Sequence, residues 1–230
     1  MIPKKIHYCW FGRNKLPAKA VKCIASWKKY CPDYEIIEWN EDNVNLDINP
    51  YVRKCYDEKR FAFLSDYIRL KVIEEAGGIY FDTDVEVLRP MDNLLRYPAY
   101  FGFETEEYIN TGLGFGAEAH NSAVIQMIKE YDVLFDGEHE VVGCPHLNTE
   151  ALIKFGLERN GKTQDLSVCM VFSADFFNPF DAPTGRLRKT ENTYSIHWYS
   201  ASWMNTYQRI RSRVTRPLHR LQELEIFRKG

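Results

Sequence analysis

The sequence predicts an α/β protein in which a mostly parallel central sheet is flanked by helices. An apolar, β-prone segment at 6–11 precedes a helical segment that begins at Pro17 and runs to about Tyr30, and a second strand-like segment follows at 34–39. Strand, helix and strand in this order favour parallel strands joined by a right-handed crossover. The chain has 230 residues, of which 45% are hydrophobic, and this is enough for one sizeable core.

The remaining elements are predicted from apolar periodicity and from turn residues. After a polar loop at 40–49, we expect helices at 50–59, 123–135 and 147–155, and strands at 85–88, 100–103, 113–117, 168–172 and 193–198.

A helix and a strand in the middle of the chain carry polar residues at their ends. Ser65 is expected to cap a helix that runs to about Ala76, and Gly77 closes it. Ser65, Asp66 and Arg69 share one side of this helix, so Asp66 and Arg69 form either a simple intrahelical ion pair or part of a site. The short strand 79–81 follows.

Asp82-Thr83-Asp84 comes directly after that strand and is the most informative feature of the chain. Residues two apart on an extended chain point to the same side, roughly 6 to 7 Å apart. Two carboxylates held in this way repel each other unless a cation lies between them, and a hard divalent cation prefers oxygen ligands. An isolated DxD also occurs as a turn or a cap, but the neighbouring helix and strand favour a site here.

A second group of polar and aromatic residues lies late in the chain. His197 offers an imidazole to a metal ion, and a tryptophan N–H can donate to a bridging oxygen. The group comprises His197, Trp198, Ser200, Ser202 and Trp203. Trp10 either stacks on a base or fills space in the core. The segment Asn110-Thr111-Gly112 is a candidate wall of a sugar pocket, because glycine permits a close approach of the backbone.

Composition restricts the class of protein. The net charge is −2, with 30 basic and 32 acidic residues, which gives no overall electrostatic case for binding nucleic acid. The six cysteines form no CxxC pair and are expected to be buried thiols in a reducing compartment. We find no signal peptide and no run of 18 apolar residues, so the expected location is the cytoplasm.

Residues 205–230 differ from the rest because basic side chains alternate with apolar ones. We therefore predict a catalytic domain at 1–204 and a basic amphipathic helical segment at 205–230. Such a segment either binds an anionic membrane surface, which would place the protein peripherally on the inner face of the plasma membrane, or packs on the domain with a solvated basic face.

Four motifs together resemble the DXD-containing sugar transferases of glycosyltransferase family 32, which is similar to the catalytic domain of the large clostridial toxins. The motifs are His7-Tyr8-Cys9-Trp10-Phe11-Gly12, Ser65-Asp66-Tyr67-Ile68-Arg69, Gly77-Gly78-Ile79-Tyr80-Phe81-Asp82-Thr83-Asp84 and His197-Trp198. The resemblance covers residues 3–117 and 197–203. It implies a GT-A-type fold, a nucleotide-sugar donor, Mn²⁺ or Mg²⁺, and retention of anomeric configuration.

The resemblance also implies roles for individual residues. Trp10 matches a ring that stacks on uracil, Asp66 and Arg69 match the pair that holds the donor sugar, and Asp82 matches the contact to ribose and sugar. Asp84 matches the direct metal ligand, with Asp82 and His197 as further candidate ligands. Trp203 matches an indole that faces the leaving oxygen, and Tyr80, Asn110, His197 and Ser202 complete the predicted donor contacts. The toxins have a carboxylate and a serine in the last region, so the sequence departs from that pattern there.

The function predicted on this basis is transfer of a hexose, from UDP rather than GDP-mannose, to a glycan or a lipid-linked oligosaccharide, as in capsule or polysaccharide synthesis. Two alternatives belong to other classes. One is a non-catalytic module that binds glycan or metal. The other is a DxD phosphotransferase, although Glu86 occupies the position where that chemistry normally has Thr or Val.

Overall fold

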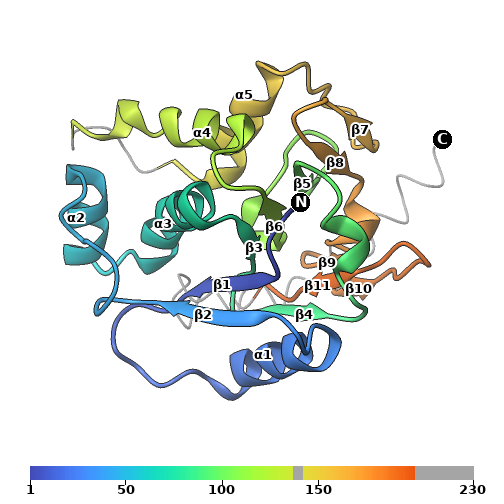
Figure 1. Ribbon diagram of the computed structural model, residues 1–230, viewed down its shortest axis with the longest axis horizontal. Helices are drawn as coiled ribbons and strands as arrows, with labels where there is room; N and C mark the ends of the chain where they lie inside the picture. Colours follow the sequence, from blue (N-terminus) through green and yellow to red (C-terminus); the bar gives the residue numbers. More distant parts are fainter. Residues whose placement is uncertain (137–141, 200–230) are drawn as a thin grey trace.

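A seven-stranded mixed sheet forms the centre of the molecule (Figure 1). The structure is a computed structural model, and it describes residues 1–136 and 142–199. Five of the strands run in one direction, while β6 and β7 run in the opposite direction, which confirms the expected α/β class with a mostly parallel sheet. Across the sheet the strands are β2 (Glu35–Trp39), β1 (Lys5–Cys9), β3 (Gly78–Tyr80), β6 (Phe115–Ala117), β5 (Ala99–Gly102), β8 (Met170–Phe172) and β7 (Gln164–Asp165).

Helices cover both faces of this sheet (Figure 1). α1 lies on one face, and the other four α-helices lie on the opposite face, where the larger hydrophobic core forms. The helices are α1 (Ala18–Tyr30), α2 (Pro50–Asp57), α3 (Phe61–Ala76), α4 (Ser122–Lys129) and α5 (Cys144–Ile153). Short 3-10 turns are η1 (Asp92–Leu94), η2 (Thr111–Leu113), η3 (Asp132–Leu134) and η4 (Ala174–Phe176).

A second, two-stranded sheet joins distant parts of the chain. β4 (Val85–Val87) pairs antiparallel with β11 (Ser195–His197), and His197 lies opposite Val85. Two side chains of α1 form hydrogen bonds with the backbone at the other edge of β4. The Trp27 indole donates to the Val85 carbonyl at 2.7 Å, and the Ser26 hydroxyl accepts from the Val87 N–H at 2.9 Å. Another small pair is formed by β9 (Phe180–Asp181) and β10 (Arg186–Leu187).

Several helix boundaries differ from the sequence predictions, and the two largest differences are in α3 and α4. Ser65 is not an N-cap: α3 begins at Phe61, and the Ser65 hydroxyl donates to the Phe61 carbonyl at 2.8 Å from within the helix. The preceding turn is helical because its apolar side chains pack in the core, where Leu64 is fully buried. The helix expected at 123–135 ends at Lys129 and is followed by η3.

Gly77 ends α3 as predicted. It has a φ of +60°, and an added Cβ would lie 2.9 Å from the Ala119 nitrogen, so only glycine fits there. The chain then turns at once into β3, which places Asp82 and Asp84 between β3 and β4. The position of the DxD therefore depends on this helix end.

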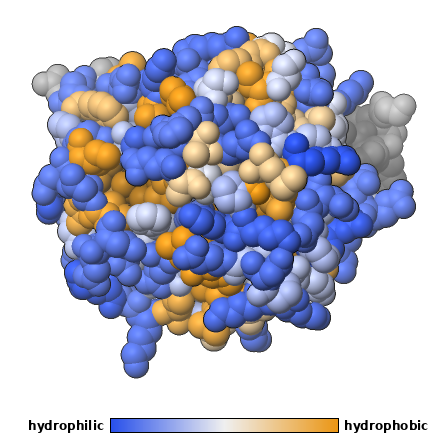
Figure 2. Space-filling model, viewed as in Figure 1, coloured by the Kyte–Doolittle hydropathy of each residue, from blue (hydrophilic) through white to orange (hydrophobic). Residues whose placement is uncertain are grey.

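Several expectations concern the surface and the thiols. All six cysteines are buried and unpaired, as predicted. No helix in the described part of the chain is long and apolar enough to cross a membrane. On the face shown in Figure 2, hydrophilic residues predominate and apolar ones lie among them in small groups. The basic segment 205–230 lies outside the described residues, so its contacts and the cytoplasmic location stay predictions.

Candidate active site

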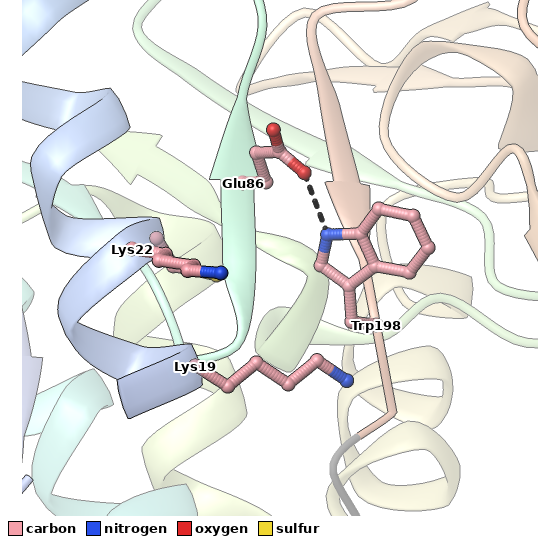
Figure 3. A pocket seen from close by; sticks show the side chains of 5 residues that line it. Lys19, Lys22, Glu86 and Trp198 are labelled. Atoms are coloured by element: carbon pink, nitrogen blue, oxygen red, sulfur yellow. Dashed lines mark hydrogen bonds between the residues drawn. The ribbon is translucent and has the colours of Figure 1, made fainter. Parts of the chain in front are cut away.

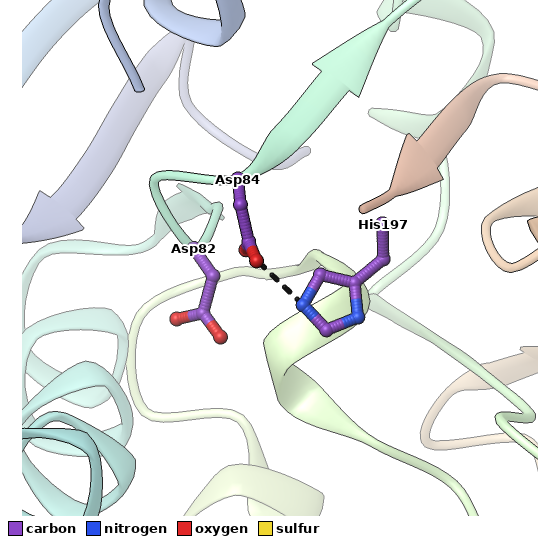
Figure 4. A group of neighbouring side chains, drawn as sticks. All are labelled: Asp82, Asp84 and His197. Atoms are coloured by element: carbon purple, nitrogen blue, oxygen red, sulfur yellow. Dashed lines mark ion pairs between the residues drawn. The ribbon is translucent and has the colours of Figure 1, made fainter. Parts of the chain in front are cut away.

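Asp82, Asp84 and His197 form a cluster at the turn between β3 and β4 (Figure 4). One ligand atom from each residue lies within 4.8 Å of the others. The His197 Nε2 atom is 3.1 Å from Asp84 Oδ1. The pairing of β11 with β4 carries His197 to the DxD, so the three predicted metal ligands meet although they come from distant parts of the chain.

The donor set of this cluster fits a divalent cation. Mg²⁺ takes octahedral ligands at about 2.0–2.1 Å, so neighbouring ligand atoms around it lie about 3 Å apart. The 3.1 Å separation of Asp84 Oδ1 and His197 Nε2 matches that spacing. Two carboxylates with one imidazole also suit Mn²⁺, which accepts oxygen and nitrogen ligands.

Burial and neighbouring charges shift the pKa values of the cluster's side chains in opposite directions. Burial raises the pKa of the Asp82 carboxyl, although Arg69 opposes this. Burial would lower the pKa of His197, but the Asp84 carboxylate outweighs it and the pKa is raised. The Nδ1 atom of His197 is buried and has no hydrogen-bond partner among the described residues.

Asp66 and Arg69 form a buried pair on α3 beside the cluster. Arg69 Nη2 contacts the Asp66 carboxylate and lies 3.5 Å from Asp82 Oδ1, so the guanidinium bridges the helix and the DxD. Burial raises the pKa of Asp66 to about 6, against the opposing charge of Arg69. Asp66 also lies near Cys144 at the N-terminus of α5, where a carboxylate is favoured.

Three residues outside the predicted catalytic and donor-binding set, Thr111, Gly112 and Asn148, hold this arrangement. Arg69 Nη1 is 3.5 Å from the Thr111 hydroxyl, which also accepts from Asn148 Nδ2 at 2.8 Å. Gly112 leaves room for the carboxylate, because an added Cβ would lie 2.7 Å from Asp82 Oδ2. Thr111 and Gly112 belong to the segment predicted as a pocket wall, whereas local sequence patterns give no signal for Asn148, because it acts across the fold.

The other predicted site residues lie in different environments. The Tyr80 ring is buried, its hydroxyl donates to Asp82 Oδ1 at 3.1 Å, and the Arg69 guanidinium lies 5.0 Å from its ring centre. The Asn110 side chain accepts from the Gly112 N–H. Trp10 is partly buried against the α1-side core, and its indole donates to the Asn14 carbonyl at 2.6 Å.

Ser200, Ser202 and Trp203 lie outside the described residues. Their roles therefore stay predictions.

The charge balance of the site favours a cation. Three carboxylates, those of Asp66, Asp82 and Asp84, lie near one guanidinium, which leaves two negative charges when His197 is neutral. A divalent cation would balance that excess and leave the guanidinium available to a polar or anionic ligand.

Comparison with known proteins finds a family whose description matches one region of the chain. Residues 17–100 match the family described as a glycosyltransferase sugar-binding region containing a DXD motif. Inositol phosphoceramide mannosyltransferase 3 of Schizosaccharomyces pombe is 35% identical over 103 residues, which cover 43% of this chain and 29% of that protein. Subversion of eukaryotic traffic protein A of Legionella pneumophila is 28% identical over 129 residues, 44% of this chain and 20% of that protein.

The chain thus spans less than a third of the length of these relatives. A solved structure described as the PaToxG glycosyltransferase has a TM-score of 0.54 and 18% identity, and the match covers 66% of this chain and 69% of that one. That likeness concerns the fold. The chain therefore has a GT-A-type fold, and residues 17–100 match a sugar-binding region that contains a DXD motif.

Proposed function

We propose that this protein is a metal-dependent glycosyltransferase, which transfers a hexose from a nucleotide sugar to a glycan or a lipid-linked acceptor. The observation that carries the proposal is the meeting of Asp82, Asp84 and His197 beside the buried Asp66–Arg69 pair. The first group suits a divalent cation, and the second offers a carboxylate and a guanidinium for a sugar and its phosphate.

Each residue has a role in this proposal. Asp84 and His197 hold the cation directly, and Asp82 contributes a third ligand or a contact to the donor. A bound divalent cation would neutralise the charge that develops on a departing diphosphate. Asp66 accepts hydrogen bonds from donor hydroxyls, while Arg69 orients Asp82 and stabilises negative charge from a fixed position. Trp10, Tyr80 and Asn110 are further proposed donor contacts, with Ser202 and Trp203 completing the site.

The donor we propose is a UDP-hexose. Because one similar protein is named as an inositol phosphoceramide mannosyltransferase, a mannose donor is the alternative to compare directly. Retention of configuration is proposed from the family resemblance, and NMR of the product anomer checks it: an inverted product would contradict this part.

A thermal-shift screen of the full chain tests the proposal. UDP-glucose, UDP-galactose and GDP-mannose are added with MnCl₂ or with EDTA. We expect one donor to raise the Tm in Mn²⁺ but not in EDTA, and Asp84→Asn to abolish the rise. Asp47→Asn is a matched control, because that carboxylate is 77% exposed and remote in sequence from the DxD. A wild-type chain that responds to no donor, or an Asp84→Asn chain that responds fully, would contradict the proposal.

A further inference from the structure

A groove separate from the metal cluster lies between α1 and the end of β11 (Figure 3). Its volume is about 420 Å³, within the range of about 300–1,000 Å³ that is typical of small-ligand sites. The lining residues are Lys19, Lys22, Cys23, Glu86 and Trp198. None of them has a role in the proposed donor site.

The groove is next to the metal cluster. Glu86 follows Asp84 by two residues, Trp198 follows His197, and the Trp198 backbone N–H donates to the Asp84 carbonyl at 3.1 Å. Burial and then the Asp84 and Glu86 carboxylates raise the pKa of the Cys23 thiol to about 12, so the thiol is neutral. The groove and the cluster therefore share the β4–β11 pair as a common wall.

The Trp198 indole is held in place and half-buried. Its N–H donates to Glu86 Oε2 at 2.8 Å, and its ring centre lies 5.2 Å from that of Phe180. Lys19 Nζ lies 5.7 Å from the ring centre, a contact that an exposed side chain readily gives up. A fixed and partly exposed indole offers an apolar face to the C–H side of a sugar ring.

The charge of the groove is positive. Lys19 and Lys22 are exposed, and neither forms an ion pair in the part of the chain that the structure describes. Figure 3 shows both amino groups pointing from α1 toward Glu86 and Trp198. Two ammonium groups face the single carboxylate of Glu86, one oxygen of which already accepts a hydrogen bond from the indole N–H. The groove therefore favours an anionic group on its ligand.

We propose that this groove binds a sugar unit that bears a carboxylate or a phosphate, as the acceptor-side subsite. The sugar ring packs on Trp198 in place of the Lys19 chain, and the two ammonium groups bind its anionic substituent. The acceptor assignment rests on the proposed function, whereas the binding of a charged sugar does not.

Isothermal titration calorimetry on the full chain tests this, with methyl β-glucuronide, glucose 6-phosphate and methyl β-glucoside as probes. A charged sugar is expected to bind at least about tenfold more tightly than the neutral glucoside. Whichever of the two charged sugars binds more tightly identifies the substituent as carboxylate or phosphate. Lys19→Met and Lys22→Met are each expected to weaken its binding about threefold to tenfold.

Two further variants sharpen the test. Lys28→Met changes another exposed lysine of α1 that does not line the groove and is expected to have no effect. Glu86→Gln keeps an acceptor for the indole N–H but removes the negative charge, so the charged sugar should bind about twofold to threefold more tightly. Lower affinity in Glu86→Gln would contradict the electrostatic argument.

The inference fails if no charged sugar binds, if the neutral glucoside binds equally well, or if Lys22→Met binds like the wild type. The donor-dependent thermal shift in Mn²⁺ is measured on the same samples and separates the two claims. A retained donor shift without sugar binding overturns the groove alone. Sugar binding that depends on the two lysines, without any donor shift, supports the groove and overturns the proposed transferase site.

Discussion

Two buried histidines, His7 in β1 and His197 in β11, have opposite electrostatic environments. The side chain of His7 is fully buried and His197 is 7% exposed, so burial alone disfavours the charged imidazole in both. Burial lowers the pKa of His7 to about 4, whereas at His197 the Asp84 carboxylate outweighs burial and raises the pKa. The partners, rather than the burial, decide which histidine can carry charge.

The partners of His7 make it a structural residue. The Trp39 indole donates to Nδ1 at 3.1 Å, so the ring proton is on Nε2, which lies 3.0 Å from the Gly77 carbonyl and donates to it. Both ring nitrogens are therefore used, and they tie β1, β2 and the end of α3 together. His197 instead has a carboxylate at Nε2 and no described partner at Nδ1, an arrangement that suits a ligand site.

The largest expected effect comes from replacing the histidine of the cluster. His197→Ala should lower metal-dependent donor hydrolysis about 10²–10³-fold, because a cation ligand is lost from a preorganised site. His7→Gln is the matched change at the structural histidine and should keep hydrolysis per folded molecule within about threefold. Equal losses in the two variants, measured at saturating Mn²⁺, would remove the distinction between the two histidines.

The next effect is on stability and depends on pH. The pKa of His7 in the folded chain, about 4, lies below the usual histidine value of 6.5, so between these pH values the unfolded chain binds a proton that the folded chain does not. The free energy of unfolding should therefore fall by about 3 kcal/mol as the pH drops from 6.5 to 4. Urea unfolding at a series of pH values measures this.

His7→Gln provides the reference for that titration, because glutamine does not ionise. The difference in unfolding free energy between the wild type and His7→Gln should shrink as the pH falls through this range. A difference that stays constant would show that the His7 pKa is not lowered.

A smaller effect is expected at Gly112. The Gly112→Ala methyl group would lie 2.7 Å from Asp82 Oδ2 and 3.1 Å from Arg69 Nη1, so the carboxylate must move. We expect about tenfold weaker donor binding. Gly143→Ala is the control, because its nearest neighbour would be 3.6 Å away. Isothermal titration calorimetry of donor binding measures the effect. A Gly112→Ala chain that binds the donor like Gly143→Ala would contradict the close approach of Gly112 to the Asp82 carboxylate.

The smallest effect is expected at Asn148, which reaches the site only through Thr111. Asn148→Ala removes the hydrogen bond that orients the Thr111 hydroxyl toward Arg69. We expect a fall in kcat of about threefold to tenfold with a smaller change in KM for the donor. If kcat is unchanged while only stability falls, Asn148 serves the core and not Arg69.

The sequence allowed some of this architecture to be predicted because the signals are local. Apolar periodicity located β1, α1 and β2, and the glycines at 77 and 78 placed the DxD after a strand. Ser65 was misassigned because its residue type suggests a cap, while core packing of the preceding turn extends the helix. Local propensity gave no information about that packing.

The supporting contacts of the candidate site were not predictable from the sequence in the same way. The Arg69–Thr111 and Thr111–Asn148 contacts join residues 42 and 37 positions apart, and they depend on how η2 is placed against α3 and against α5. His197 was selected as an imidazole in the polar and aromatic group late in the chain and through family resemblance, but its contact with Asp84 requires the antiparallel pairing of β11 with β4. Such long-range pairings leave no periodic pattern in a single sequence.

The most direct test of the account is a Mn²⁺ titration followed by electron paramagnetic resonance, in the presence of UDP. The wild type and Asp47→Asn are predicted to remove one Mn²⁺ per chain from the free signal, whereas Asp84→Asn should bind at least about tenfold more weakly. Binding of Mn²⁺ by Asp84→Asn with wild-type affinity would contradict the claim that the DxD and His197 form a metal site.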